Sequence, residues 1–453
     1  MGFKKDMVWG GATASYQIEG AAFEDGKGLN VWDICCEKPG FVRDGDTGIE
    51  ACDHYHRYKE DVALMKQLGF NAYRFSLSWA RILPDGTGKV NEAGLDFYDK
   101  LVDELLSAGI EPYVTLFHWD YPYELYKKGG WLNKDSSDWF AEYTKVVVDR
   151  LSDRVTHWMT LNEPQLFINT GHADGVHAPG LKLDRGQILI AGHNALLAHG
   201  KACQVIRKYS KKPCEIGFAP AIGVVCPATT DEKDIEAAKK AMFEASIFEN
   251  ATWSVAYWME PVMNGRYPEE SIKANGKWWP DFPEEDMKII HQPIDFCGMN
   301  SYFGSYVKAA DNELGYEFCK FSSGYPRTEM DWEITPEILY YGPKFLYERY
   351  KKPILITENG MAGMDFVHLD GKVHDPQRID FLHRYLKEYK KAADDGVDIK
   401  GYLQWSLMDN FEWAEGYRKR FGLIYVDYET KERILKDSAY WYADVIKNNG
   451  ENL

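Results

Sequence analysis

The sequence repeats one unit along its length: an amphipathic helix, a stop signal, a short apolar run, and a polar or aromatic loop. In the segment 92–109, apolar residues recur at helical spacing, and Gly109 follows them where a left-handed residue commonly ends a helix. The apolar run 110–117 comes next and has the length of a strand. Because short apolar strands separated by helices need helical crossovers, this unit predicts a sheet of parallel strands.

Eight apolar runs of this kind are present, at 8–9, 72–75, 110–117, 155–161, 215–219, 294–299, 353–357 and 397–405. Helices are predicted over 58–69, 92–109, 137–151, 188–209, 284–290 and 336–350, and a further helix opens at Asp375-Pro376. Eight strands with helical crossovers close into a (β/α)8 or TIM barrel, so we predict a single barrel domain over residues 1–453. The alternative, an open doubly wound sheet, usually has a Gly-rich phosphate-binding turn after an early strand, and residues 10–12 (Gly-Gly-Ala) do not supply it.

Charge and composition disfavour several classes of protein. The formal net charge of −17 would repel the phosphates of nucleic acids. No window approaches the length of about 18 apolar residues that a membrane span needs, and no signal-peptide pattern opens the chain, so we expect a soluble, cytoplasmic protein. The cysteines form no C-x-x-C pair, and no second ligand cluster accompanies Cys52, His54 and His56, so we predict reduced thiols and no metal. The sequence does not fix the oligomeric state.

Polar and aromatic residues follow the predicted strands at their C-terminal ends, where the loops of a barrel build its active site. These residues are Gln17, Arg74, His118-Trp119, Asn162-Glu163, Asn300, Tyr302, Glu358 and Trp405. Amide, carboxyl, imidazole and aromatic side chains are the types that bind sugar hydroxyls and cover sugar rings. The strand ends therefore indicate a carbohydrate site.

Glu163 and Glu358 suggest that the chemistry at this site is glycoside hydrolysis. The reaction needs one carboxylic acid that protonates the leaving oxygen and one carboxylate that meets the developing oxocarbenium ion. The two residues are distant in sequence, but a barrel would bring the ends of its fourth and seventh strands face to face. Either glutamate taken alone could instead be a salt-bridged residue at the rim.

Two motifs contain these glutamates: Thr-Leu-Asn-Glu-Pro at 160–164 and Ile-Thr-Glu-Asn-Gly at 356–360. They resemble the paired signatures of glycoside hydrolase family 1, the β-glucosidases, and the resemblance extends from 9–17 to 438–442. It implies a (β/α)8 barrel, hydrolysis with retention of configuration, and no cofactor. The substrate it implies is a small β-glucoside such as cellobiose, a short β-glucan or an aryl glucoside.

The resemblance implies roles for the residues around the scissile bond. Glu163 matches the general acid/base and Glu358 the nucleophile, and in a retaining enzyme their carboxyl groups lie about 5 Å apart. The charge of Glu358 would raise the pKa of Glu163, and Arg74 would keep Glu358 ionised. Tyr302 matches a hydrogen-bond donor to Glu358, and Asn300 supports it.

The resemblance also implies a subsite for the first sugar. Its expected hydroxyl ligands are Gln17, His118, Asn162 and Glu412, with Asn162 on the 2-hydroxyl. The expected aromatic contacts are Trp413, which closes the subsite, Trp405 as its floor and Phe421 as a wall, with Trp119 in support next to His118. Trp332 matches an aromatic residue on the leaving-group side.

Two positions bear on specificity. Relatives that act on 6-phosphorylated sugars have no acidic residue at the position of Glu412. An ionised Glu412 would repel a phosphate dianion, so we expect the substrate to carry a free sugar, favouring glucose. The alternatives are a 6-phospho-β-glycosidase and a non-catalytic sugar-binding relative, which should lack one of the two carboxyl groups. Gln165 stands where many relatives have Trp, so the preferred leaving group stays open.

Overall fold

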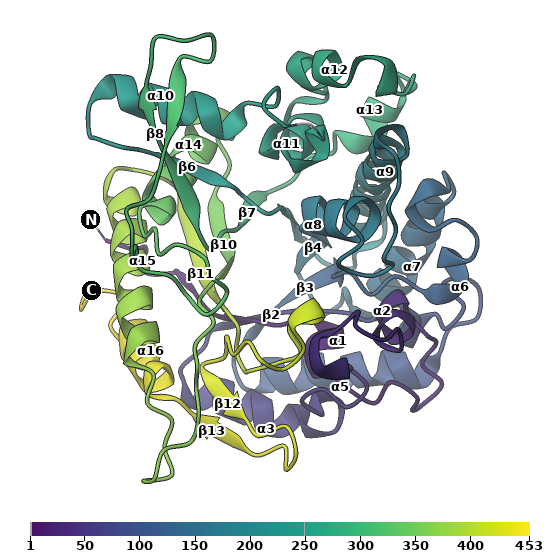
Figure 1. Cartoon of the computed structure of the whole chain (residues 1–453). Helices are drawn as coiled ribbons and strands as arrows, with labels where there is room; N and C mark the ends of the chain where they lie inside the picture. The colour runs from purple at the N-terminus through teal and green to yellow at the C-terminus, as the bar shows by residue number, and fades with distance from the viewer. Residues whose placement is uncertain (1, 249) are drawn as a thin grey trace.

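The computed structural model describes residues 2–248 and 250–453. Eight parallel strands form a closed barrel surrounded by helices (Figure 1). In barrel order the strands are β1 (Val8–Ala12), β11 (Ile399–Trp405), β10 (Ile354–Asn359), β7 (Phe296–Asn300), β5 (Glu215–Ala219), β4 (His157–Asn162), β3 (Glu111–Phe117) and β2 (Ala72–Ser76). β1 pairs in parallel with both β11 and β2, which closes the barrel. The predicted (β/α)8 barrel is therefore confirmed, and the open doubly wound sheet is wrong.

The predicted helices are present, with bounds that differ by a few residues. They are α3 (His54–Gln67), α5 (Glu92–Ser107), α7 (Ser136–Leu151), α9 (Arg185–Tyr209), α13 (Asp286–Ile290), α14 (Ile338–Tyr350) and α15 (Pro376–Asp394). The start of α3 differs most from the prediction, because its first turn is polar: His54 is buried there, with Nδ1 2.7 Å from Asp61 Oδ2. Apolar periodicity gives no signal for such a turn.

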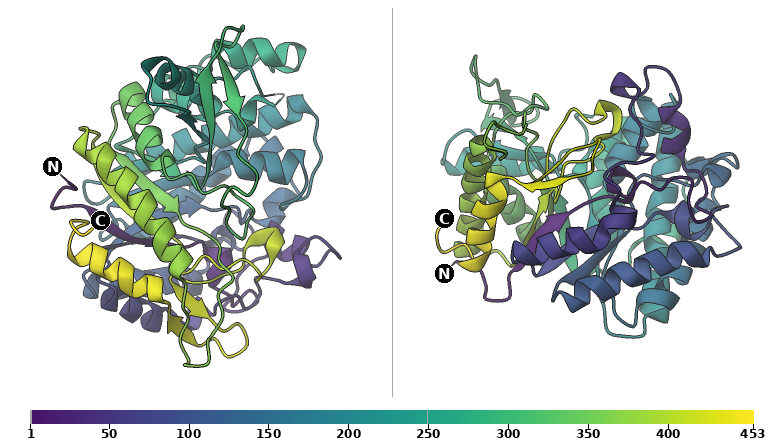
Figure 2. Two further views of the ribbon diagram at one scale, coloured as in Figure 1. Left: turned by 60° about the vertical axis from the view of Figure 1, so that its left-hand side comes forward. Right: turned by 90° about the horizontal axis from the view of Figure 1, so that it is seen from below.

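Further helices lie in the loops and at the end of the chain. They are α1 (Ser15–Ile18), α2 (Val31–Cys36), α4 (Trp79–Ile82), α6 (Tyr123–Tyr126), α8 (Pro164–Ile168), α10 (Glu232–Phe243), α11 (Val255–Asn264), α12 (Glu269–Asn275) and α16 (Asp437–Lys447). α15 and α16 lie side by side near both ends of the chain (Figure 2). Among the described residues, no helix has the length and apolar character needed to cross a membrane.

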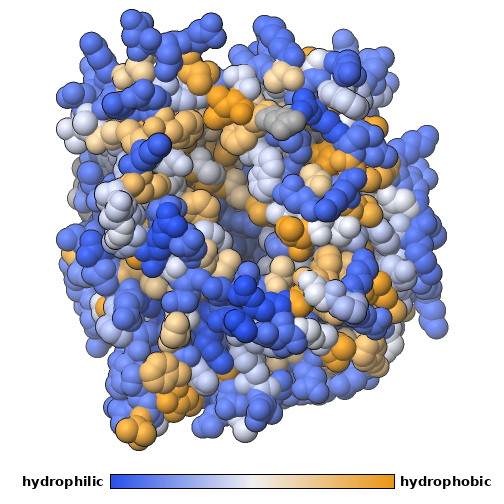
Figure 3. Space-filling model, viewed as in Figure 1, coloured by the Kyte–Doolittle hydropathy of each residue, from blue (hydrophilic) through white to orange (hydrophobic). Residues whose placement is uncertain are grey.

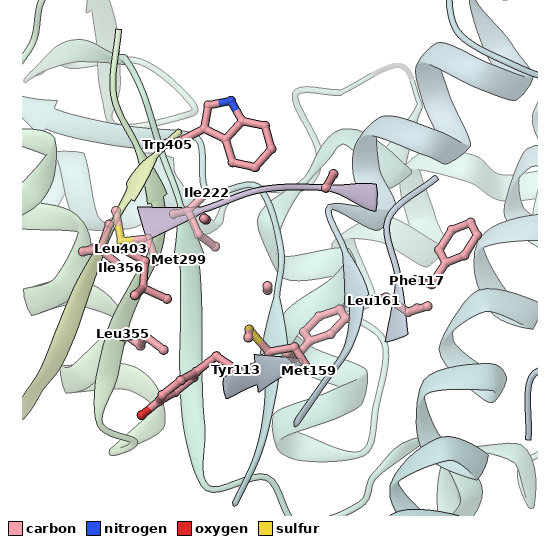
Figure 4. Packing of buried hydrophobic residues seen from close by; sticks show 14 of the residues in the cluster. Tyr113, Phe117, Met159, Leu161, Ile222, Met299, Leu355, Ile356, Leu403 and Trp405 are labelled. Carbon is pink, nitrogen blue, oxygen red and sulfur yellow. The ribbon is translucent and has the colours of Figure 1, made fainter. Parts of the chain in front are cut away.

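Buried apolar side chains fill the region between the strands. Figure 4 shows part of this packing, with Tyr113 at one end and Trp405 at the other. Tyr113 lies near the start of β3, whereas Trp405 is the last residue of β11. Because the barrel is packed with side chains, a ligand can reach it only at an end, and the polar residues are at the C-terminal ends of the strands.

Two small sheets that the sequence did not indicate lie outside the barrel. One contains β6 (Val224–Pro227), β8 (Gly304–Ala309) and β9 (Tyr316–Cys319) and packs against α10. The other is a ribbon of β12 (Ile424–Val426) and β13 (Arg433–Leu435). β6 and β8 follow barrel strands β5 and β7 closely in sequence, so the three-stranded sheet extends the C-terminal face of the barrel (Figure 1).

Candidate active site

The C-terminal ends of the barrel strands open into a cavity of about 730 Å³. It is visible as a hollow near the centre of the face in Figure 3. Glu163 and Glu358 both line it, and they are only 8% and 3% exposed. Neither glutamate is a solvated rim residue. The volume is in the range of about 300–1,000 Å³ that small-molecule sites have.

Two donors hold the carboxylate of Glu358 at the end of β10. Arg74 Nη1 donates a hydrogen bond to Oε1 at 2.6 Å, and the Tyr302 hydroxyl donates one to Oε2 at 2.7 Å. Two residues later the chain passes directly against β11, where a Cβ on Gly360 would overlap the carbonyl oxygen of Trp405. Only glycine permits this approach, so the orientation of Glu358 is fixed both by its partners and by its backbone.

Asn162, the last residue of β4, connects Arg74 to the neighbouring polar residues. Its Oδ1 accepts hydrogen bonds from Arg74 Nη2 at 2.6 Å and from Asn300 Nδ2 at 2.9 Å. Its Nδ2 lies 3.0 Å from His118 Nε2, and its carbonyl oxygen accepts a bond from Trp119 Nε1 at 3.0 Å. The network orients Arg74 and Asn300 under the cavity. That Asn162 itself binds a sugar hydroxyl stays a prediction.

Glu163 has an uncommon backbone conformation between β4 and α8. Its φ is 43°, in the left-handed region that residues with a Cβ rarely adopt. Trp119 (φ 77°) and Trp413 (φ 50°) share this region and also line the cavity. Such conformations persist where the surrounding structure imposes them, and they cluster at functional sites.

The two carboxyl groups ionise in a definite order. Burial raises the pKa of Glu163 well above its ordinary value, and the nearby charge of Glu358 raises it further. The pKa of Glu358 is also raised by burial, but less than that of Glu163, because Arg74 and the Tyr302 hydroxyl lower it. Glu358 therefore loses its proton first, and Glu163 keeps its proton while Glu358 is charged. This is the expected order, although burial contributes more to the pKa of Glu163 than Glu358 does.

Glu412 differs from the expectation that it is ionised. Burial, followed by the charge of Glu358, raises its pKa to about 8, although a hydrogen bond from Gln17 lowers it. A pKa of about 8 favours the protonated form at neutral pH, which weakens the expected charge repulsion of a phosphate in the free protein. None of the described residues that line the cavity is Lys or Arg. A phosphate group would therefore find no cation there.

Gln17 and His118 each have a buried polar atom without a partner among the described residues. These atoms are Gln17 Oε1 and His118 Nδ1. Gln17 Nε2 donates to the Phe411 carbonyl oxygen at 2.8 Å and lies 3.3 Å from Glu412 Oε2. Burial lowers the pKa of His118 well below its ordinary value, so the ring is neutral. A buried polar atom without a hydrogen-bond partner destabilises the folded state, and a bound ligand could supply a partner to each of these two atoms.

Aromatic side chains lie on two sides of the cavity. His118 stacks with Trp405 and Trp413, with ring centroids 5.8 Å and 5.9 Å apart. Trp332 and Phe421 form a second pair, with centroids 6.1 Å apart. The structure thus brings the predicted aromatic residues into one cavity.

Eleven of the fourteen predicted site residues line the cavity, and the other three, Gln17, Arg74 and Asn162, lie directly behind its surface. Several apolar residues of the cavity lining, such as Val225, Met242 and Phe318, were not predicted. In sequence these residues have the character of core positions, and only the three-stranded sheet and α10 place them at the cavity. Within 2–248 and 250–453, no group of three or more His, Cys, Asp or Glu side chains is arranged to bind a metal ion.

We predict that Glu358→Gln lowers the pKa of Glu163. The substitution removes the charge that is the second-largest cause of the raised pKa, whereas burial remains, so the pKa should fall but stay above its ordinary value. Infrared spectroscopy of protein with isotope-labelled glutamate can follow the titration. Glu124→Gln on α6, which removes an exposed carboxylate paired with Lys127, is the control. An unchanged pKa of Glu163 in Glu358→Gln would mean that the two carboxyl groups do not interact.

Comparison with known proteins identifies the family. Residues 1–451 match the model of glycosyl hydrolase family 1. The chain is 47% identical over 449 residues to a 1,4-beta-D-glucan glucohydrolase of Thermotoga neapolitana, covering 99% of each chain. It is 39% identical over 482 residues to an aryl-phospho-beta-D-glucosidase of Bacillus subtilis, covering 100% of this chain and 98% of the relative. The solved structure of a beta-glucosidase from Thermotoga maritima in complex with glucoimidazole is similar with a TM-score of 0.90 at 46% identity, covering 99% of both chains. The chain belongs to glycosyl hydrolase family 1.

Proposed function

We propose that this protein is a retaining β-glucosidase that uses Glu163 as acid/base and Glu358 as nucleophile. The observation that carries the proposal is the unequal surroundings of two carboxyl groups in one cavity. Glu358 accepts hydrogen bonds from Arg74 and Tyr302, whereas burial and the charge of Glu358 keep Glu163 protonated. One carboxyl group is thus ready to donate a proton and the other to attack.

In the first step Glu163 donates its proton to the glycosidic oxygen while a carboxylate oxygen of Glu358 bonds to the anomeric carbon. The electron pair of the broken carbon–oxygen bond leaves with the alcohol. Glu358 is then an uncharged ester, so the Coulomb repulsion that raised the pKa of Glu163 disappears. The pKa of Glu163 therefore falls, so Glu163 stays ionised after it gives up its proton and can accept one from water.

In the second step Glu163 takes a proton from water, and the water oxygen attacks the anomeric carbon on the face that the alcohol left. The bond to Glu358 breaks, and its electron pair returns to the carboxylate beside Arg74. Two displacements at one carbon give retention of configuration.

A glucosyl unit fits the polar inner part of the cavity. Its hydroxyl groups can satisfy Gln17 Oε1 and His118 Nδ1, and the protonated Glu412 can donate a hydrogen bond to it. Trp405 and Trp413 flank the imidazole of His118 and supply the apolar surfaces on which a sugar ring packs.

We predict that Glu163→Gln acts selectively on substrates with poor leaving groups. For cellobiose, kcat/KM should fall by about 10²–10⁴-fold, the usual contribution of general acid catalysis. For a dinitrophenyl β-glucoside the loss should be below about tenfold, because that leaving group needs no proton. Steady-state kinetics on both substrates measure the contrast, with Glu124→Gln as a control on the exposed surface. Equal losses on both substrates would exclude Glu163 as the acid.

A 6-phospho-β-glucosidase is the second candidate, because one relative carries the name aryl-phospho-beta-D-glucosidase. The lining of the cavity argues against it, since no described lining residue is Lys or Arg. We predict that kcat/KM for nitrophenyl β-glucoside exceeds that for its 6-phosphate by at least about 10²-fold, equivalent to the loss of charge-assisted hydrogen bonds. A higher kcat/KM for the 6-phosphate would overturn the assignment of a free sugar.

A further inference from the structure

The part of the cavity away from Glu163 and Glu358, called here the outer part, is mainly apolar. An apolar wall there consists of Val225, Met242, Ile247, Phe248, Phe303 and Phe318. Its residues come from the three-stranded sheet, from α10, from the segment that follows α10, and, for Phe303, from the connection between β7 and β8. The wall belongs to the same cavity as Glu163 and Glu358, and hydrophobic residues border the hollow in Figure 3.

Part of this wall is exposed although it is strongly apolar. Phe318 is 49% exposed and Phe303 42%, whereas Met242, which lines the same cavity, is only 3% exposed. Phe303 is also stacked on Trp332, with ring centroids 5.3 Å apart. Exposed apolar surface that is continuous with a ligand site commonly marks where part of the ligand binds.

Two polar side chains of the cavity lining near the wall, Gln165 and Ser301, are already engaged with the backbone. Gln165 Nε2 donates to the carbonyl oxygen of Ala221 at 2.8 Å, and Gln165 Oε1 accepts from the amide of the same residue at 3.2 Å. The Ser301 hydroxyl donates to the carbonyl oxygen of Ile222 at 2.9 Å. These side chains are therefore poorly placed to bond to a ligand.

This arrangement distinguishes between two kinds of leaving group. A chain of glucosyl units would bring many hydroxyl groups against the apolar wall, where each loses water without gaining a partner. A hydrocarbon group would gain binding free energy from the same contact, because apolar surface of both the ligand and the wall would be removed from water.

We propose that the apolar wall binds the leaving group of glucosides whose aglycone is an extended hydrocarbon. The proposal rests on the proposed β-glucosidase function and specifies its substrate class. Phe303, Met242 and Phe318 contact the hydrocarbon, while the glucosyl unit occupies the polar inner part. The wall thereby favours amphiphilic glucosides over longer β-glucans.

A series of n-alkyl β-glucosides from ethyl to octyl, used below the concentration of micelle formation, tests the proposal. The acidity of the leaving alcohol is nearly constant along this series, so changes in kcat/KM report binding of the chain. We expect kcat/KM to rise by up to about fourfold for each buried methylene group, chiefly through a lower KM. Extending cellobiose to cellotriose should change kcat/KM by less than about twofold, because the added hydroxyl groups gain no partners.

Phe318→Ser and Phe366→Ser form a matched pair of variants. Phe366 is 56% exposed, as accessible as Phe318, but it is not part of the cavity. In Phe318→Ser, kcat/KM for octyl glucoside should fall by about tenfold, whereas Phe366→Ser should match the unmodified protein. β-Glucosyl fluoride, whose leaving group cannot reach the wall, should be hydrolysed equally by all three proteins.

Each result supports or overturns the proposal. A kcat/KM that does not rise with alkyl chain length, or a rise that is the same in Phe318→Ser and Phe366→Ser, overturns it. A gain from cellobiose to cellotriose of more than about tenfold also overturns it, because the outer part would then bind sugar. If β-glucosyl fluoride is not hydrolysed by the unmodified protein, the proposed β-glucosidase function fails, and this proposal fails with it.

Discussion

Arg74 is almost completely buried, at 1% exposure, and its guanidinium group donates hydrogen bonds to both Glu358 and Asn162. A buried cation needs a partner of opposite charge, and leaving either member of such a pair alone costs about 3–5 kcal/mol. The pair therefore holds the end of β10 near the ends of β2 and β4. It also makes Glu358, and not Glu163, the carboxyl group that is charged. The proposed division into an acid and a nucleophile depends on this one interaction.

The cavity presents a polar surface to one part of a substrate and an apolar surface to the other. Its inner part offers buried polar atoms, among them Gln17 Oε1 and His118 Nδ1, that a sugar can satisfy. Its outer part offers the apolar wall, where Gln165 is already bonded to the backbone. Since the outer part is built by elements outside the barrel, it can vary between relatives while the barrel positions Glu163 and Glu358 in the same way.

The barrel and the polar residues at its strand ends were predictable because both leave a local pattern, whereas Glu412, Trp413, Phe421 and Trp332 were predicted only from the resemblance to the family. The run 215–219 coincides with β5, and Glu163 and Glu358 fall at strand ends, where the barrel brings them together. The short strands β6, β8 and β9 leave no comparable pattern. The raised pKa of Glu412 also has no local signal, because it depends on burial beside Glu358 by segments distant in sequence. The positions of site residues can thus be inferred from sequence more readily than their protonation states.

Trapping the covalent intermediate tests directly whether Glu358 is the nucleophile. A 2-deoxy-2-fluoroglucoside with a good leaving group should transfer its sugar to the protein and be released slowly, because fluorine destabilises the oxocarbenium-like transition state of each step. Mass spectrometry of the intact protein and of its peptides then locates the sugar. We expect one fluoroglucosyl group per chain, attached to Glu358. Attachment to a different residue, or turnover of the fluorosugar with inversion and no adduct, would contradict this expectation.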